Sequence, residues 1–465
     1  MKRLFIPLIT FTSLMMLSFS QPAGDPSDPW DNQYPKILQE ITPPAFRNKI
    51  YDIRKYGAVP DNPGFLNTKA INSAISLCSK KGGGTVLVPR GTWHTGPVVL
   101  KSRVNLKIDE GAVLLFTPDT SQYPVVLTRW EGMDCINVSP MIYAYGETDI
   151  AITGKGTIDG GASVRNWWGM KRLTAVPGKE LRGRPLLMDM NEKGVPAEKR
   201  IMRASDNLRP QLINLYKCRN VLIRDVTLTR PAFWTIHPLL SENITVKGVT
   251  IITDGAPNGD GCDPESCRNV LIEDCFFNTG DDCIAIKSGR NFDGRKWNVP
   301  SENIIVRKCR MQNGHGGVVI GSEISGGYRN LFVEDCDMNS PELERVIRIK
   351  TNDCRGGTIE NLFVRNVNVG QCSESVLHIN LVYEPNEDCT RDFPPYVRNV
   401  FLDNVKCQKS RYGVYIDGFK ESTNVSNINL LNCEWNNVKE KNRISGKVDG
   451  LVFSNTTINS EPVKY

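Results

Sequence analysis

Histidine is scarce in this chain, with only four among 465 residues. The fourteen cysteines include no CxxC pair, so the ligand spacing typical of a zinc site is missing. No basic run is interleaved with aromatic residues, which argues against nucleic-acid binding. We therefore expect no zinc site, no cofactor and no nucleic-acid partner.

Long hydrophobic runs are also lacking, with one exception at the N-terminus. Residues 4–19 are mostly apolar and follow Lys2 and Arg3, and small residues precede Gln21. The run is shorter than the ~20 residues of a typical membrane span, and no second run follows. We therefore predict that residues 1–20 are a secretory signal peptide rather than a membrane anchor, and that the protein is secreted or periplasmic with no membrane partner.

The remaining composition, 40% hydrophobic and 23% charged, is typical of a folded globular protein with a sizeable core. Without Lys2 and Arg3, 55 of the 57 basic residues remain against 51 acidic ones, a net charge of +4. This mild excess is only weak support for an anionic ligand.

A short phrase recurs along the chain from residue 220 onward, at steps of 23 to 38 residues. It begins with Asn, alternates apolar and polar residues, and has Val or Cys at its seventh place. The copies are NVLIRDV from Asn220, NITVKGV from Asn243, NVLIEDC from Asn269, NIIVRKC from Asn303, NLFVEDC from Asn330, NLFVRNV from Asn361, NVFLDNV from Asn399 and NINLLNC from Asn427. Alternation is typical of a strand with one buried face, and stacked copies would bury those faces together. The repeat therefore predicts an all-β, single-domain, right-handed parallel β-helix.

The first and seventh places of the phrase each predict a structural role. Asn tolerates left-handed backbone at turns, and stacked Asn side chains could form a ladder. A place that accepts Val or Cys is a small buried slot. We therefore expect core thiols at Cys275, Cys309, Cys336 and Cys433. Secretion would also permit disulfides, and the candidates by closeness are Cys262/Cys267 and Cys275/Cys283.

The segments outside the repeat predict the rest of the architecture. Residues 67–79 have apolar residues at helical spacing, so we expect a short helix that caps the open N-terminal end of the β-helix. We interpret residues 21–49 as an extended lead and residues 50–465 as the β-helix domain. Residues 165–205, rich in charge and poor in strand signals, should form a long loop or arm over one face.

Register within the repeat brings candidate catalytic residues together. Asp281 follows Asn269 by 12 residues, and His315 follows Asn303 by 12. The two side chains should therefore lie on neighbouring coils, about 4.8 Å apart. Asp281 and Asp282 are adjacent carboxylates, so at least one pKa should rise, as a general acid requires.

Other charged residues fall in the neighbouring coils. Arg348 and Lys350 alternate with isoleucines and share one strand face, where two cations can hold a carboxylate. Asp260 lies in a glycine-rich turn one coil before the aspartate pair. Each residue alone has an ordinary structural explanation: an exposed turn, a surface histidine or a solvated strand face. Their position in consecutive coils predicts one groove.

These motifs resemble glycoside hydrolase family 28, the polygalacturonases, over roughly residues 50–460. The matching motifs are Asn258-Gly259-Asp260, Asp281-Asp282, Gly314-His315-Gly316 and Arg348-Ile349-Lys350. Gly259 departs from the family, which usually has Thr there, and Thr253-Asp254 offers an alternative aspartate. By spacing, Tyr383 is the candidate for a family tyrosine that follows the Arg-Ile-Lys motif.

The resemblance implies a pectin-lyase-like solenoid that hydrolyses α-1,4-galacturonosyl bonds of pectin with inversion and without a metal. Asp281 would protonate the leaving oxygen, Asp260 and Asp282 would activate water, and His315 would tune the acid. The substrate-binding residues would be Asn258, Arg348, Lys350 and Tyr383. Inversion predicts about 6.5–9.5 Å between acid and base.

Several alternatives stay open at this point. One is a Ca²⁺-dependent pectate lyase, and another is a non-catalytic glycan-binding β-helix. A third is a rhamnogalacturonan or xylogalacturonan hydrolase of the same family. The motifs do not separate endo from exo action, although an arm at residues 165–205 could block one end of the groove. We expect a monomer whose partner is an acidic polysaccharide or oligosaccharide.

Overall fold

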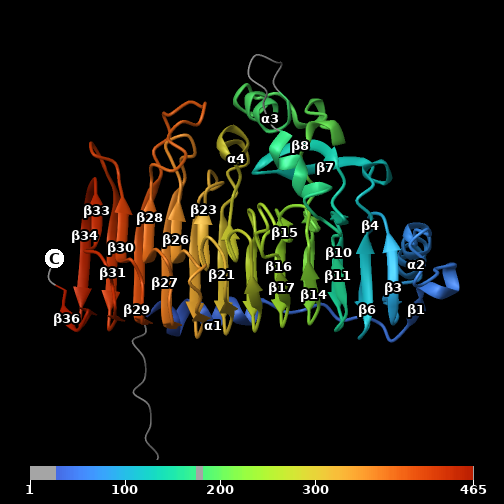
Figure 1. Ribbon diagram of the computed structural model, residues 1–465, viewed down its shortest axis with the longest axis horizontal. Coiled ribbons are helices and arrows are strands. Elements are labelled where there is room, and N and C mark those ends of the chain that lie inside the picture. Colours follow the sequence, from blue (N-terminus) through green and yellow to red (C-terminus); the bar gives the residue numbers. More distant parts are fainter. Residues whose placement is uncertain (1–27, 174–181, 464–465) are drawn as a thin grey trace, which may run out of the picture.

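The computed structural model describes residues 28–173 and 182–463, so the expected signal peptide lies outside the described residues. The chain winds into a solenoid whose coils stack side by side (Figure 1). Strands of successive coils pair in parallel, which confirms the predicted parallel β-helix. No helix in the described part of the chain is long and apolar enough to cross a membrane.

Each coil contributes strands to up to three stacks, which run the length of the solenoid. The first stack contains β1 (Ile50–Asp52), β2 (Gly84–Val88), β5 (Val104–Ile108), β10 (Thr148–Thr153), β13 (Arg219–Arg224), β16 (Glu242–Lys247), β18 (Arg268–Glu273), β21 (Ser301–Arg307), β24 (Tyr328–Glu334), β27 (Thr358–Val369), β29 (Tyr396–Cys407), β31 (Thr423–Leu431) and β34 (Lys447–Ser454). The second contains β3 (Gly91–Thr95), β6 (Ala112–Phe116), β11 (Thr157–Asp159), β14 (Thr227–Thr229), β17 (Thr250–Ile252), β19 (Phe276–Asn278), β22 (Arg310–Met311), β25 (Asp337–Met338), the ends of β27 and β29, β32 (Glu434–Trp435) and β35 (Thr457–Ile458), which pairs with β36 (Glu461–Pro462).

The third stack positions the candidate site. It contains β4 (Val98–Val99), β9 (Ile142–Tyr145), β12 (Ile213–Tyr216), β15 (Ile236–Leu239), β20 (Ile284–Ile286), β23 (Val318–Gly321), β26 (Arg345–Lys350), β28 (Ser375–Asn380), β30 (Tyr412–Asp417) and β33 (Arg443–Ser445). Between β15 and β20, Cys262 bridges both neighbours and fills the missing rung. The third stack is therefore continuous through the region of the aspartates.

The repeat phrase occupies the first stack, and its Asn residues form the expected ladder. Asn361 donates to Asn330 at 3.0 Å and accepts from Asn399 at 2.9 Å, with a backbone φ of +63°. Where the ladder reaches Asn269, that side chain instead donates to Glu40. The asparagines thus combine left-handed turn geometry with bonds between coils.

Cysteine at the seventh place is buried and unpaired, as predicted, at Cys275, Cys309, Cys336 and Cys433. Both predicted disulfides, Cys262/Cys267 and Cys275/Cys283, are wrong because all four thiols are free in the core. The described disulfide is Cys354–Cys389, which joins two loops outside the repeat with a Cα–Cα distance of 5.9 Å. Closeness in sequence misleads here because the neighbouring cysteines lie at different places around a coil: Cys262 and Cys283 belong to the third stack or its start, whereas Cys267 and Cys275 flank β18 of the first stack.

The N-terminal cap forms where it was expected. Helix α2 (Thr68–Lys80) buries Ala70, Ile71, Ala74, Ile75 and Cys78 in the main hydrophobic core. It contacts β1, β2, β4 and β5, so it covers the first coil (Figure 1). A helix over this end removes a strand edge that would otherwise pair with another chain.

The interpretation of residues 21–49 as an extended lead is wrong over residues 29–40, which form helix α1 (Pro29–Glu40). Asp28 caps its first turn by accepting from the amide of Trp30. Tyr34 and Ile37 then pack on apolar side chains that point outward from the first stack, namely Leu271, Ile305, Phe332 and Phe363. Tertiary packing on this aromatic stripe stabilises a helix that the segment's own composition does not indicate.

Residues 165–205 form an arm that is more helical than the expected loop. The arm holds the short 3-10 helices Trp167–Leu173, Ala197–Lys199 and Ala204–Asp206, and helix α3 (Gly183–Glu192), while residues 174–181 lie outside the described residues. An antiparallel hairpin of β7 (Val125–Trp130) and β8 (Met133–Val138) packs beside it. Arm and hairpin lie together on one side of the solenoid, next to α4 (Asn291–Trp297) (Figure 1).

Candidate active site

Three carboxylates meet at the start of the third-stack strands. Asp281 and Asp282 lie just before β20, and Asp260 lies two residues before the bridging Cys262. One oxygen of each carboxylate lies within 4.8 Å of the others. Asp254, the alternative aspartate, is exposed and lies outside this cluster.

His315 joins the cluster from the next coil. Its Nδ1 lies 3.0 Å from Oδ1 of Asp281, and its backbone amide donates to the Asp281 carbonyl at 3.1 Å. The predicted neighbourhood of these two side chains is confirmed. Gly314 permits it, because a Cβ atom there would lie 2.7 Å from the Asp281 carbonyl oxygen.

Asp282 is fully buried beside the two predicted cations. Lys350 Nζ donates to its Oδ2 at 2.7 Å, and Arg348 lies 3.4 Å from its Oδ1. Tyr383 covers both cations, with its ring centroid 5.6 Å from the Arg348 guanidinium and 5.4 Å from Lys350 Nζ. Arg348 and Lys350 therefore face the groove as expected, but here they pair with a carboxylate of the protein.

Asp260 belongs to a buried charged group that the sequence did not reveal. Lys287 Nζ lies 3.9 Å from its Oδ2 and 3.1 Å from Glu323. Both oxygens of the neighbouring Asp263 are buried without a hydrogen-bond partner among the described residues. The alternation Ile284-Ala285-Ile286-Lys287, with both isoleucines in the core, puts Lys287 on the outward face and is the signal that could have pointed to this residue.

Asn258 lies at the rim of the cluster. Its side-chain oxygen accepts from Arg209 at 2.7 Å. Arg209 also donates to the carbonyls of Ala232 and Pro257, so it fixes the turn that holds Asp260. Burial lowers the pKa of Arg209 to about 10. Sequence reasoning missed Arg209 because this residue follows the arm and lies far from Asn258 in the sequence.

The electrostatics differ from the expectation for the aspartate pair. Burial alone would raise the pKa of Asp281, but the hydrogen bond from His315 and the charge of Lys350 outweigh it and hold the pKa below its usual range. The same bond raises the pKa of His315, against the effect of burial. At Asp260, burial and the neighbouring Asp263 and Asp281 raise the pKa well above the usual range.

The three carboxylates are grouped closely, with one oxygen of each within 4.8 Å of the others. The three aspartates lie on adjacent rungs and at one turn, so strand spacing brings their side chains together. The separation of about 6.5–9.5 Å between acid and base groups, which inversion requires, stays a prediction.

Outward-facing side chains of the third stack form one row through the site. Strand register aligns Asn214, His237, Asp263, Ala285, Val319, Arg348, His378, Tyr415 and Arg443. We call this set the outer row. It runs along the solenoid axis, so an extended ligand lying on it would cross successive coils.

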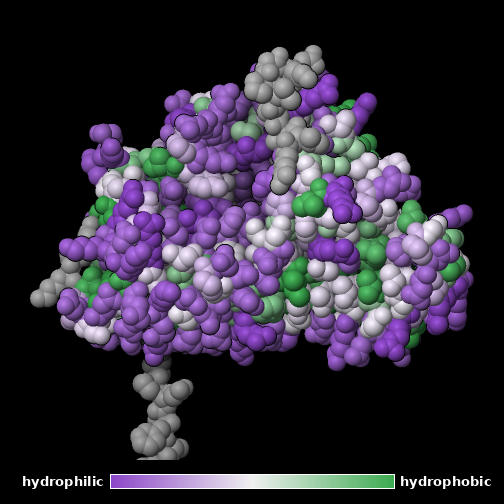
Figure 2. Space-filling model, in the orientation of Figure 1, coloured by the Kyte–Doolittle hydropathy of each residue, from purple (hydrophilic) through white to green (hydrophobic). Residues whose placement is uncertain are grey.

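The outer row is covered at one end and open at the other. From Asn214 through Val319 the row has no exposed surface, and the hairpin contacts its N-terminal end. Thr128 of the hairpin bonds Asn214, and Arg129 pairs with Glu265 at 2.9 Å. Toward the C-terminus Tyr415 is half-buried and Arg443 is exposed. Figure 2 shows this face hollowed between the arm and the loops after β28, with hydrophilic residues around the hollow.

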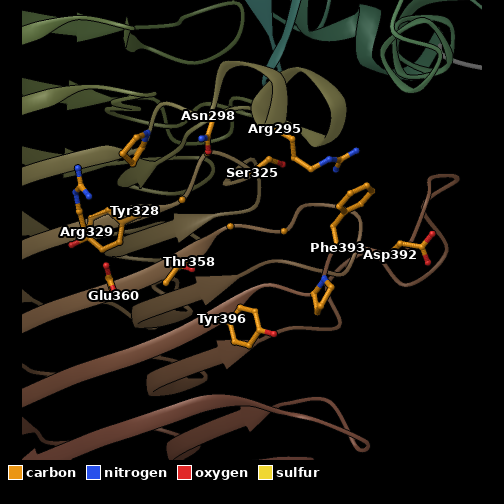
Figure 3. Close-up of a pocket in the computed structure, with 16 residues that line it drawn as sticks. Arg295, Asn298, Ser325, Tyr328, Arg329, Thr358, Glu360, Asp392, Phe393 and Tyr396 are labelled. Carbon is orange, nitrogen blue, oxygen red and sulfur yellow. The ribbon is translucent and has the colours of Figure 1, made fainter.

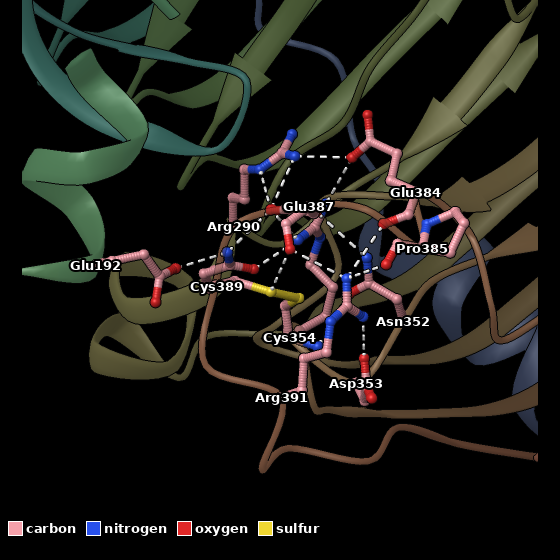
Figure 4. Close-up of a disulfide and its surroundings, with 12 residues drawn as sticks. Glu192, Arg290, Asn352, Asp353, Cys354, Glu384, Pro385, Glu387, Cys389 and Arg391 are labelled. Atoms are coloured by element: carbon pink, nitrogen blue, oxygen red, sulfur yellow. Dashed lines mark hydrogen bonds and ion pairs between the residues drawn. A yellow bond between two sulfur atoms is a disulfide. The ribbon is translucent and has the colours of Figure 1, made fainter. Parts of the chain in front are cut away.

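A network of buried ion pairs fixes the wall beside the row (Figure 4). Arg290 pairs with Glu384 at 2.8 Å and Glu387 at 2.9 Å, and Arg355 pairs with Glu387 at 2.8 Å. The Cys354–Cys389 disulfide lies next to these contacts and anchors the same loop. Because Tyr383 immediately precedes Glu384, the network also holds Tyr383 over the two cations.

A separate pocket of about 710 Å³ lies away from the carboxylates (Figure 3). It is lined by residues at the start of β24 and β27 and by the loop that contains Phe393. None of the predicted site residues lines it. The chemistry suggested by the sequence therefore belongs to the third stack and not to this pocket.

Comparison with known proteins agrees with this geometry. A hyperthermoactive exopolygalacturonase from Thermotoga maritima has a similar structure, with a TM-score of 0.85 and 36% identity over 92% of this chain and 96% of that chain. A probable polygalacturonase from Vitis vinifera is 34% identical over 324 residues, which is 67% of this chain and 59% of that relative. An exo-poly-alpha-D-galacturonosidase from Dickeya chrysanthemi is 26% identical over 90% of this chain and 73% of its own length. The family model of glycosyl hydrolases family 28 matches residues 78–395, and the chain belongs to that family.

Proposed function

We propose that this protein is a polygalacturonase that hydrolyses α-1,4-galacturonosyl bonds of pectin and acts from one end of the polysaccharide. The observation that carries the proposal is the cluster of Asp260, Asp281 and Asp282 beside Arg348 and Lys350. Carboxylates supply acid and base, and paired cations suit a uronate. Family membership and the named activities of the relatives support the same reaction.

Each residue has a proposed role. Asp281 protonates the leaving glycosidic oxygen, while Asp260 and Asp282 hold and deprotonate the attacking water. His315 adjusts the protonation of Asp281. The substrate-binding residues are Asn258, Arg348, Lys350 and Tyr383.

Substrate binding would redistribute the proton within this cluster. A substrate carboxylate at Arg348 and Lys350 neutralises a charge that now lowers the pKa of Asp281. Asp281 then accepts the proton that its reaction requires. A neutral Asp281 no longer raises the pKa of Asp260, so Asp260 gives up its proton more readily and, once ionised, can accept a proton from water. The protonation states thus belong to the coupled group and change together.

The roles are tested with Asp281→Asn on polygalacturonate. We expect the release of reducing ends to fall by at least about a hundredfold while binding persists. Asp254→Asn is the matched control, because that aspartate is exposed and outside the cluster. Equal release by wild type and Asp281→Asn would refute the assignment.

Two rival chemistries give different products. A pectate lyase needs Ca²⁺, and the three aspartates lie close enough together to hold a cation. We expect activity to survive a chelator and no ultraviolet-absorbing unsaturated product to accumulate. Proton NMR of the first product should show the inverted anomer.

A rhamnogalacturonan or xylogalacturonan hydrolase would prefer those polymers over polygalacturonate, and a glycan-binding β-helix would turn over none of them.

Exo action is proposed because the hairpin lies over the N-terminal end of the outer row, where Thr128 bonds Asn214 two rungs before the coil of Asp260 and Arg129 pairs with Glu265 of that coil. A chain bound at the carboxylates can extend only toward Tyr415 and Arg443. Chromatography of early products should therefore show a single short product, monomer or dimer, from the start. A ladder of mixed oligomers would mean endo action.

We also propose that residues 50–465 act as a single catalytic domain and that the protein works as a secreted or periplasmic monomer. The apolar N-terminal run supports export. Detection of the mature N-terminus near Gln21 in a periplasmic or culture fraction tests the location. Light scattering tests the oligomeric state.

A further inference from the structure

The outer row continues for three strands beyond Arg348. Register places His378 of β28 beside Arg348, Tyr415 of β30 beside His378, and Arg443 of β33 beside Tyr415. Three strand spacings correspond to about 14 Å. A ligand that reaches Arg443 from the carboxylate cluster must therefore be longer than the unit held by Arg348.

These side chains form a ready-made stack. The His378 and Tyr415 rings are nearly parallel, with centroids 4.4 Å apart and an interplanar angle of 9°. The Arg443 guanidinium lies 5.0 Å from the Tyr415 ring centroid. Burial and the nearby Arg345 and Arg348 lower the pKa of His378 to about 3, so the imidazole is a neutral platform. The stack reduces the freedom that Arg443 would lose on binding a ligand.

Of the two cations in the outer row, Arg348 pairs with Asp282, whereas Arg443 has no ion pair among the described residues. Arg345 pairs with Glu344 and Glu374, and Arg411 pairs with Glu440 at 2.8 Å. Among the described residues, Arg443 has the Tyr415 ring contact and no ion pair. Its side chain is exposed at the open end of the row. A planar guanidinium with free N–H groups is suited to bind a carboxylate in a bidentate fashion.

We propose that Arg443, positioned by Tyr415 and His378, binds a uronate carboxylate of the substrate beyond the unit at Arg348. The inference rests on the proposed function, since it extends the same groove. It makes the site selective for long acidic chains. The ligand class is an oligomer with a carboxylate on every sugar, several units longer than the shortest substrate.

The test compares wild type with Arg443→Gln on trigalacturonate, which is too short to reach Arg443, and on polygalacturonate. We expect KM for polygalacturonate to rise about fivefold relative to any change in KM for trigalacturonate, with kcat for the polymer retained, because one partly exposed charged contact is lost. Arg443→Lys should recover only part of the loss, because it restores the charge and not the fork. Arg268→Gln removes an exposed arginine from the first stack and should leave both KM values unchanged.

The outcomes separate the two proposals. An Arg443→Gln variant with the wild-type ratio of polymer to trimer KM would overturn the Arg443 site. An equal loss in Arg268→Gln would overturn it too, since total charge would then explain the effect. Wild-type protein that releases no product from either substrate would refute the proposed function. In that case calorimetry with an oligogalacturonate still tests Arg443, because the wild-type protein must bind this ligand more tightly than the Arg443→Gln variant does.

Discussion

The chemistry of this site depends on which aspartate holds a proton and which forms an ion pair. Asp281, Asp282 and Asp260 have the same side chain but three different surroundings, namely a histidine, two cations, and a buried carboxylate neighbour. Sequence spacing predicts that these residues meet. It does not predict which one holds the proton, because Lys287 and Asp263 act on the cluster from positions the motifs do not mark.

The first prediction concerns the pH dependence of His315. Its pKa is raised, so the protonated pair with Asp281 persists above the ordinary histidine range and is lost as pH rises through the raised value. We expect kcat/KM to fall along this alkaline limb. His315→Asn should lower activity about a hundredfold and flatten the limb. His94→Asn, on β3 at the N-terminal end of the solenoid, should keep the wild-type profile. A retained limb in His315→Asn would assign it to another group.

The second prediction concerns the ion pair between Lys350 and Asp282. Burial alone would lower the pKa of Lys350, but the charge of Asp282 outweighs it and raises the pKa. Lys350→Met leaves Asp282 buried with only the longer Arg348 contact, so the free energy of unfolding should fall by about 3 kcal/mol in urea titrations. The double variant Lys350→Met/Asp282→Asn should recover part of this loss. A double variant as unstable as the single one would argue against a charge effect.

At the scale of elements, the repeating strands could be predicted from the sequence, whereas the elements added to them once could not. The phrase fixes the first stack, the Asn ladder and the buried thiols at Cys309 and Cys336, because each copy repeats the same packing problem. Helix α1, the hairpin and the Cys354–Cys389 disulfide occur once each. Their positions depend on surfaces that exist only after the coils have stacked, such as the stripe around Phe332.

The third prediction concerns the ladder at Asn361. This residue bonds the coils on both sides and has a φ of +63°. Asn361→Ala loses both bonds and adds left-handed strain, whereas Asn361→Gly loses the bonds alone. Alanine should therefore be more destabilising than glycine by about 1 kcal/mol in denaturant titrations. If glycine is the worse substitution, backbone strain is not the deciding effect at this turn.

The whole molecule is a one-dimensional stack in which each coil contacts mainly its neighbours. The two ends differ. Helix α2 buries the N-terminal coil, whereas β34 is largely exposed and is followed only by the short β35–β36 pair.

The fourth prediction follows from this difference between the ends. Amide hydrogen exchange should be fastest in residues 447–463 and slowest in the coils between β13 and β29, since an end coil opens without breaking contacts on two sides. Mass spectrometry of peptides from both regions measures it. Uniform protection along the solenoid would show that it opens only as a whole.

The buried thiols have a consequence for how the chain matures. Twelve of the fourteen cysteines are free and buried, and several are stacked on successive coils, including Cys275, Cys309 and Cys336. In an unfolded chain all fourteen are open to oxidation, and the native pair is one of many possible partnerships. If the chain is exported to an oxidising compartment, as proposed, coil formation competes with oxidation of these thiols. A chain that folds late would form non-native disulfides, so the coils have to form before the native disulfide does.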